Sequence, residues 1–194
     1  MPGTAAKTTM RRVVLMLLPA AAVLAGFATA MAQTPSAAPA AQAAPAGKSG
    51  LPLPRFVSLK SDRVNLRQGP GTEYPTAWVY RRAGLPLEVV REFEGWRQVR
   101  DAEGATGWVL QSFLSGRRTA LVLPWEVKAN APPPEVALRD DDRENARPVA
   151  LVEAGVIASI HSCSGRWCRV TIDKFRGWIE QKKLWGVYDG ETVK

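Results

Sequence analysis

The sequence predicts an all-β fold in which two small barrels follow one another along the chain. Three observations lead to this prediction: an internal repeat, short β-branched runs bounded by glycine, and the lack of a sustained helical period. Residues 1–50 have a different composition, rich in Ala and Pro, and are not expected to join either barrel.

The repeat becomes visible when the chain from residue 51 onward is compared with itself. The matching segments are 70 to 72 residues apart: 64–67 with 136–139, 83–84 with 154–155, 107–109 with 177–179, and Leu114 with Leu184. A nearly constant offset over several anchors indicates a duplicated module. We therefore place one domain at 51–120 and a second at 121–194.

Each copy carries the signals of short antiparallel strands. The predicted strands cover 87–91, 96–100 and 107–109 in the first copy, and 156–160, 167–172 and 177–179 in the second. Glycines at 95 and 165 mark hairpin tips, and helix is expected only as single turns near 111–113 and 181–183. Several short strands per copy predict a small barrel, because closure removes exposed strand edges.

The N-terminal region resembles an export signal followed by a spacer. Basic residues precede an uncharged stretch over 13–32, which ends in the small-x-small pattern Ala30-Met31-Ala32. The alternative is a membrane anchor, since 20 uncharged residues could just span a bilayer. We expect a cleaved signal peptide at 1–32, no stable membrane insertion after cleavage, and a disordered Ala/Pro linker at 33–50.

Charge is distributed unevenly and argues against a nucleic-acid ligand. The formal net charge of the whole chain is +8, but Lys7, Arg11, Arg12 and Lys48 belong to the predicted leader and spacer. From residue 51 onward, 22 basic residues accompany 18 acidic ones. An exported protein with so small an excess and no basic stripe is not expected to bind nucleic acid.

Cys163 and Cys168 are predicted to form a disulfide bond. An exported protein meets an oxidising compartment, and the four residues between the cysteines have the character of a tight turn. The rival interpretation is a redox pair. Against it, the spacing is C-x₄-C and not C-x-x-C, and no helix N-terminus is evident to lower the pKa of a thiol.

At this point the residues resemble a known family. Residues 65–74 (NLRQGPGTEY) are similar to the opening signature of bacterial SH3 (SH3b) domains, and Gly107-Trp108-Val109 closes the same pattern. The second copy resembles the tandem SH3-like periplasmic proteins of Gram-negative bacteria. The resemblance implies SH3-like barrels without enzymatic activity of their own. In better-understood relatives it implies binding to cell-wall peptides, and it implies a periplasmic location.

Strand alternation selects candidate ligand-binding aromatics. Trp96 and Trp167 lie three positions before the inward-facing Val99 and Val170, so each is expected on the outer face of its barrel. The alternative is that the two barrels cover each other's tryptophan. Further candidates for the same groove are Tyr74, Trp78 and Tyr80.

The remaining tryptophans are assigned to structure. Trp108 and Trp178 are expected in the core or in barrel closure, Trp185 at the end of the second barrel, and Trp125 buried at the junction. In the second copy, Asp140–Ala146 replaces the loop of the first copy that contains glycines and Tyr74. Because the aromatic residue is lost there, we expect ligand binding to centre on the first copy.

We expect no catalytic centre, no metal site and no cofactor. His161 is the only histidine, and it lies two residues from Cys163, whose thiol the predicted disulfide would occupy. No ligands stand at metal-binding spacing, and the carboxylates are scattered over turns.

The predicted function is therefore a non-catalytic binding protein of the periplasm. It would bind a peptide of the cell envelope, with peptidoglycan stem peptide as one candidate. The alternative is a structural or protein-interaction protein whose aromatics are buried between the barrels or against a periplasmic partner. The exposed fraction of the Trp96 and Trp167 side chains distinguishes these two functions, because deep burial favours the structural or interaction protein.

Overall fold

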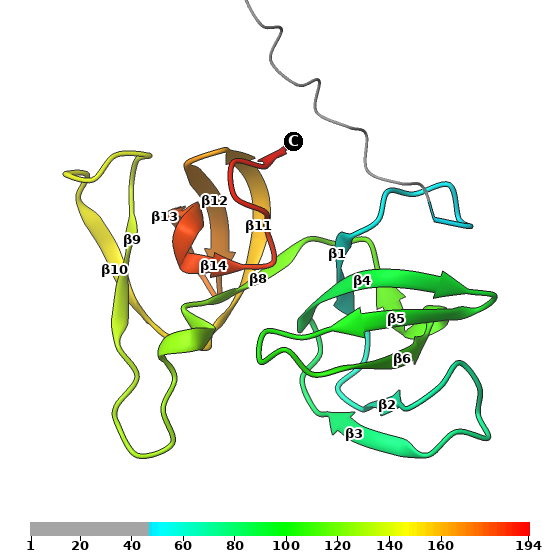
Figure 1. Cartoon of the computed structure of the whole chain (residues 1–194). Helices are drawn as coiled ribbons and strands as arrows, with labels where there is room; N and C mark the ends of the chain where they lie inside the picture. Colours follow the sequence, from blue (N-terminus) through cyan, green and yellow to red (C-terminus); the bar gives the residue numbers. More distant parts are fainter. Residues whose placement is uncertain (1–46) are drawn as a thin grey trace, which may run out of the picture. The chain divides into compact units, whose positions relative to one another are not determined.

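Two antiparallel sheets account for the architecture of residues 47–194, the part of the chain that the computed structural model describes (Figure 1). These residues belong to one compact unit. They form short strands and three 3₁₀ turns, with no α-helix among them. In this part of the chain no helix has the length and hydropathy needed to cross a bilayer. The predicted signal peptide, 1–32, and the predicted linker up to residue 46 lie outside the described residues.

The first sheet has seven strands in the order β3-β2-β6-β5-β4-β1-β7. The strands are β1 (Arg55–Leu59), β2 (Val64–Arg67), β3 (Thr76–Tyr80), β4 (Pro86–Phe93), β5 (Trp96–Arg100), β6 (Thr106–Leu110) and β7 (Leu114–Ser115). The 3₁₀ turn η1 (Gln111–Phe113) joins β6 to β7, where the sequence predicts a single helical turn.

The second sheet repeats this order as β10-β9-β13-β12-β11-β8-β14, and β15 adds to β11. Its strands are β8 (Thr119–Val122), β9 (Glu135–Arg139), β10 (Pro148–Glu153), β11 (Ile157–Ser164), β12 (Trp167–Ile172), β13 (Phe175–Glu180), β14 (Leu184–Trp185) and β15 (Thr192–Val193). Two more 3₁₀ turns are η2 (Pro124–Glu126) and η3 (Gln181–Lys183). The proposed boundary at 120/121 falls inside β8.

The duplication extends to the pairing register. Arg67 in β2 pairs with Trp108 in β6, and Arg139 in β9 pairs with Trp178 in β13. In both sheets the hydrogen-bonded path runs between two terminal strands, from β3 to β7 and from β10 to β14. The architecture is thus all-β and tandem, and the expected closure into barrels is not seen in the pairing.

Alternation along the strands separates a core face from an outer face, as predicted. Val99 in β5 and Val170 in β12 are fully buried, as are Val109 and Ile179 in the next strands. Each sheet packs its inward residues into its own apolar cluster. Trp108 and Trp178 directly precede Val109 and Ile179, so they lie on the opposite face and belong to neither cluster.

Two local features complete the fold. Cys163 and Cys168 are cross-strand partners in β11 and β12 and form the predicted disulfide. Residues 47–50, which close the predicted linker, form a hydrogen-bonded turn in which the Gly50 amide donates to the Gly47 carbonyl, so the linker is ordered at this end.

Gly107 permits β2 to approach β6 closely. A Cβ at this position would lie 2.6 Å from Leu66 Cγ and 2.8 Å from the Arg67 carbonyl oxygen, and Gly177 meets Leu138 and the Arg139 carbonyl in the same way. We predict that Gly107→Ala lowers the free energy of unfolding by about 1–3 kcal/mol, because the backbone must shift.

Gly116→Ala is the matched control for this variant, since no atom lies within 4 Å of its added Cβ. Urea unfolding of the two variants checks the prediction. Equal stability of Gly107→Ala and the wild type would contradict the close approach.

Candidate functional site

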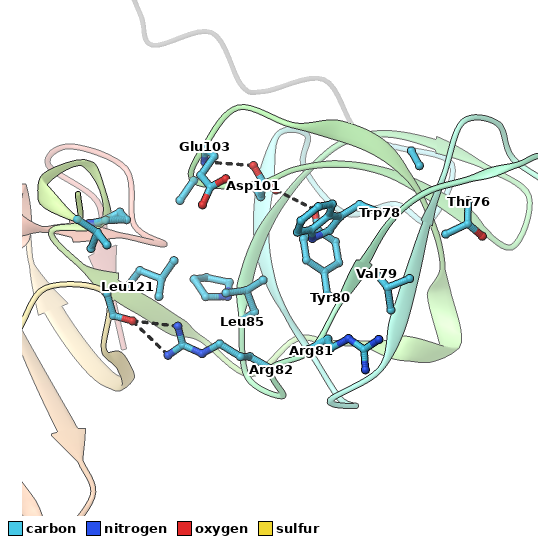
Figure 2. A pocket seen from close by; sticks show the side chains of 16 residues that line it. Thr76, Trp78, Val79, Tyr80, Arg81, Arg82, Leu85, Asp101, Glu103 and Leu121 are labelled. Atoms are coloured by element: carbon cyan, nitrogen blue, oxygen red, sulfur yellow. Dashed lines mark hydrogen bonds between the residues drawn. The ribbon is translucent and has the colours of Figure 1, made fainter. Parts of the chain in front are cut away.

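Two of the five predicted ligand-binding aromatics come together on β3. Trp78 and Tyr80 are two residues apart in this strand, so their side chains lie on the same face. Trp78 is 62% exposed, whereas Tyr80 is buried at 4%. Both side chains are labelled in Figure 2. An exposed indole and a buried phenol on one face of β3 are the centre of the candidate site.

A pocket of about 710 Å³ lies along β3. This volume is in the range of small-ligand sites. The pocket is lined by all residues of β3, by Arg81 and Arg82, and by the β5–β6 turn over 101–103. Leu85 and Pro86, at the start of β4, add to the lining, and residues around β8 and η2 complete it: Leu121, Pro124, Val127 and Gly155. Apolar surface thus lies beside a few charged groups.

Tyr80 and Asp101 line the pocket and are hydrogen-bonded to each other. The Tyr80 hydroxyl donates to Asp101 Oδ2 at 3.0 Å, while Asp101 Oδ1 accepts from the backbone amides of Glu103 and Ala105. Burial, and then the charge of Asp101, raise the pKa of Tyr80, so its hydroxyl stays a donor at physiological pH. The hydrogen bond therefore holds the neutral phenol of Tyr80 and the carboxylate of Asp101 in place.

The basic residues of the pocket lie apart from its acidic ones. Both terminal nitrogens of Arg82 donate to the Gly155 carbonyl at 3.1 Å. In Figure 2 the Arg81 guanidinium points away from Asp101 and Glu103. Neither carboxylate takes part in an ion pair among residues 47–194.

The expectation that Trp167 stands exposed on the outer face is wrong. Trp167 lies on the face opposite Val170, as alternation requires, yet it is only 3% exposed. The chain after β13 packs beside this hairpin: the Gln181 amide donates to the Arg166 carbonyl, and β15 pairs with Cys163 and Ser164. Trp96 is partly buried and lies across from Leu110 and Phe93.

Tyr74 belongs to a loop outside the pocket. Its ring lies against Gly69, and Arg67 Nη1 donates to the carbonyls of Thr72 and Tyr74 at 3.0 and 2.7 Å. In the second copy Arg139 donates in the same way to the Ala146 carbonyl. The arginine therefore holds this loop in both copies, and its recurrence at 67 and 139 was a sequence signal for that role.

Register shows where the second copy differs from the candidate site of the first. Leu66 pairs with Trp78 and Val64 with Tyr80; at the matching places Leu138 pairs with Ala150 and Val136 with Val152. Ala150 and Val152 thus replace the two aromatics. That ligand binding centres on the first copy stays a prediction.

A family comparison identifies both halves of the chain. The model of the bacterial SH3 domain matches residues 60–116 and residues 132–186, together more than half of the chain. The chain belongs to the bacterial SH3 domain family. This confirms the resemblance and the tandem arrangement. No curated protein matches the chain.

Solved structures show only a distant likeness. NlpC2 and NlpC1 from Trichomonas vaginalis are each 12% identical with a TM-score of 0.30; the matches cover 68% and 72% of this chain and 48% of either structure. An NlpC/P60 family protein from Bacillus cereus is 12% identical with a TM-score of 0.29, over 67% of this chain and 55% of that one. The chain spans about half the length of these structures, and likeness at this level carries no argument about function.

The aromatics that join the two SH3 domains differ from those expected. Phe56 in β1 meets Trp185 edge-on at 5.2 Å and Tyr188 at 4.8 Å between ring centroids. The Tyr188 hydroxyl donates to the buried Glu88, which also pairs with Arg100. Sequence reasoning missed Phe56 and Tyr188 because neither belongs to a repeated motif.

Trp125 also departs from expectation. Trp125 is 53% exposed and so is not buried at the junction. Trp185 contacts a residue of the first SH3 domain, in addition to its place in β14 of the second.

The residues expected to be candidates for metal binding or nucleophilic chemistry are placed as follows in the described part of the chain. Residues 47–194 contain no group of three potential metal ligands. His161 is hydrogen-bonded to the Thr171 hydroxyl at 2.7 Å, and both cysteines are in the disulfide.

A buried carboxylate holds the segment before β1 in place. Glu92 accepts from the amide and hydroxyl of Ser49, each at 2.7 Å, and forms ion pairs with Arg55 and Arg97. Burial alone would raise the pKa of Glu92. The Ser49 hydrogen bonds and the two arginines outweigh this effect and lower the pKa to about 2.

Glu92→Gln is expected to destabilise the protein by about 2–3 kcal/mol at pH 7. Because the folded pKa is depressed, the contribution of Glu92 is present above the ordinary value of 4.5 and is lost as pH falls towards 2. The stability gap between wild type and variant should therefore narrow on acidification, as measured by urea unfolding at several pH values. Glu135→Gln, at an exposed position, is the control. A stability difference between wild type and Glu92→Gln that does not change with pH would contradict the lowered pKa of Glu92.

Tyr80→Phe is expected to cost about 1 kcal/mol of stability, because Asp101 loses a buried donor. Tyr74→Phe is the matched control, since its hydroxyl takes part in no hydrogen bond within residues 47–194. Equal unfolding midpoints for the two variants would show that the Tyr80–Asp101 bond does not anchor the pocket.

Proposed function

We propose that this chain is a non-catalytic binding protein of the bacterial cell envelope whose first SH3 domain takes an extended peptide in the pocket at Trp78. The observation that carries this proposal is the 62% exposure of a tryptophan at the mouth of a 710 Å³ pocket. Trp is the residue type most often responsible for binding energy at interfaces. Leaving so much of it in water is unfavourable for the isolated protein.

The strand that carries Trp78 supports an extended ligand. β3 is the terminal strand of its sheet, with β2 as its neighbour in the pairing order. A peptide can therefore pair with the other edge of β3 through backbone hydrogen bonds. Alternate side chains of such a peptide would then face the Trp78 side of the strand.

Envelope location enters the proposal through the sequence. The uncharged stretch over 13–32 and its cleavage pattern favour export, and bacterial SH3 domains are associated with cell-wall peptides. Peptidoglycan stem peptide is accordingly the first ligand to test. We assign no chemical step to the pocket, because Asp101 is engaged by Tyr80 and by two backbone amides.

A second candidate is a structural or interaction protein of the periplasm. Burial of Trp167 and the packing of Phe56 against Trp185 and Tyr188 favour it, since these aromatics serve internal contacts. In that case Trp78 would contact a protein partner instead of a cell-wall peptide. Binding to purified cell wall separates the two candidates.

Trp78→Ala is expected to reduce retention of the protein on purified sacculi about tenfold or more, because the largest apolar contact is removed. Phe175→Ala is the matched control, as Phe175 is an exposed aromatic in the second SH3 domain outside the pocket. Trp96→Ala tests the original candidate on β5 and should have a smaller effect. Equal retention of wild type and Trp78→Ala would end the proposal for this pocket.

A further inference from the structure

We propose that the pocket at Trp78 recognises a primary ammonium group on its peptide ligand. The inference rests on the proposed function and adds the chemical class of the ligand. It is drawn from the pocket as a whole: an exposed indole, two carboxylates at one end, and basic side chains directed elsewhere.

The two carboxylates differ in role. Asp101 is fixed by the Tyr80 hydroxyl and by the amides of Glu103 and Ala105, all of which are neutral donors. Its negative charge is therefore oriented without being neutralised by a cation. Glu103 is exposed and forms no ion pair within residues 47–194, so it can approach a bound ammonium directly.

Trp78 supplies the second part of the recognition. The face of an indole attracts a cation through its quadrupole, more strongly than other aromatic side chains do. The apolar stem of a lysine-like side chain can lie on the same ring while its charged end reaches the carboxylates. An ammonium between Trp78 and Glu103 would satisfy both interactions.

The arginines that line the pocket do not occupy this position. Arg82 is committed to the Gly155 carbonyl, and the Arg81 guanidinium lies away from the acidic end in Figure 2. An ammonium at the acidic end is therefore spared the repulsion that it would meet near Arg81. The second SH3 domain, with Ala150 and Val152 in place of the aromatics, should not share this preference.

Two short peptides test the inference: Ala-Lys-Ala blocked at both ends, and the same peptide with an Nε-acetyl-lysine. Their binding to the full chain is followed through the indole N–H signal of Trp78 in NMR spectra, assigned with Trp78→Ala. We expect the free amine to bind about fivefold more tightly, in line with a partly exposed ion pair and a cation–π contact. Glu103→Gln should abolish the difference, whereas Glu135→Gln, which removes an equal charge outside the pocket, should keep it.

Each outcome decides a separate statement. Equal binding of both peptides overturns the ammonium inference and leaves the pocket as a peptide site. Discrimination that survives in Glu103→Gln overturns the assignment of the ammonium to Glu103. If neither peptide shifts the Trp78 signal, the inference falls. The proposed function falls with it only when sacculi also fail to distinguish wild type from Trp78→Ala.

Discussion

The close approach of β2 to β6 at Gly107 is the constraint on which the rest of the first SH3 domain depends. With no Cβ there, Leu66 and the Arg67 carbonyl pack directly against the strand. The β2–β3 hairpin then lies beside the β5–β6 turn, which lets Tyr80 reach Asp101. Gly177 has the same role against Leu138 and Arg139, so the duplicated scaffold keeps the constraint even where the site is absent.

The two copies of the duplicated module differ in the side chains that they carry at matching places. The first keeps the aromatics of β3 and the acidic turn, and so keeps a pocket with an exposed indole. The second replaces those aromatics by Ala150 and Val152 and adds the disulfide between β11 and β12. It also supplies Trp185 and Tyr188, which pack on Phe56 of the first copy. The two copies therefore differ in which side chains they expose and which they use in contacts with each other.

The sequence predicted the elements that local chemistry and repetition determine. The 70–72-residue offset, the turns at 111–113 and 181–183, and the Cys163–Cys168 bond depend on neighbours along the chain, and the structure confirms them. Alternation correctly placed Trp167 opposite Val170. It could not tell that the outer face would be covered, because residues far along the chain, from Gln181 to Val193, return to this hairpin. Phe56 and Tyr188 were missed for the same reason, since contacts between copies leave no repeated pattern.

The terminal strands β3 and β10 occupy matching places in the two sheets, and their edges can be compared. Terminal strands expose unpaired backbone groups, and proteins protect them with proline, charge or bulges. β10 starts at Pro148, has an irregular register after it, and ends at Glu153. β3 contains neither proline nor charge from Thr76 to Tyr80, although its register with β2 is also irregular near Arg67. Pro75 precedes β3 and Arg81 follows it, so both edges have proline at one end and charge at the other. The two edges differ at the centre of the strand, where β3 carries Trp78 and β10 carries Ala150.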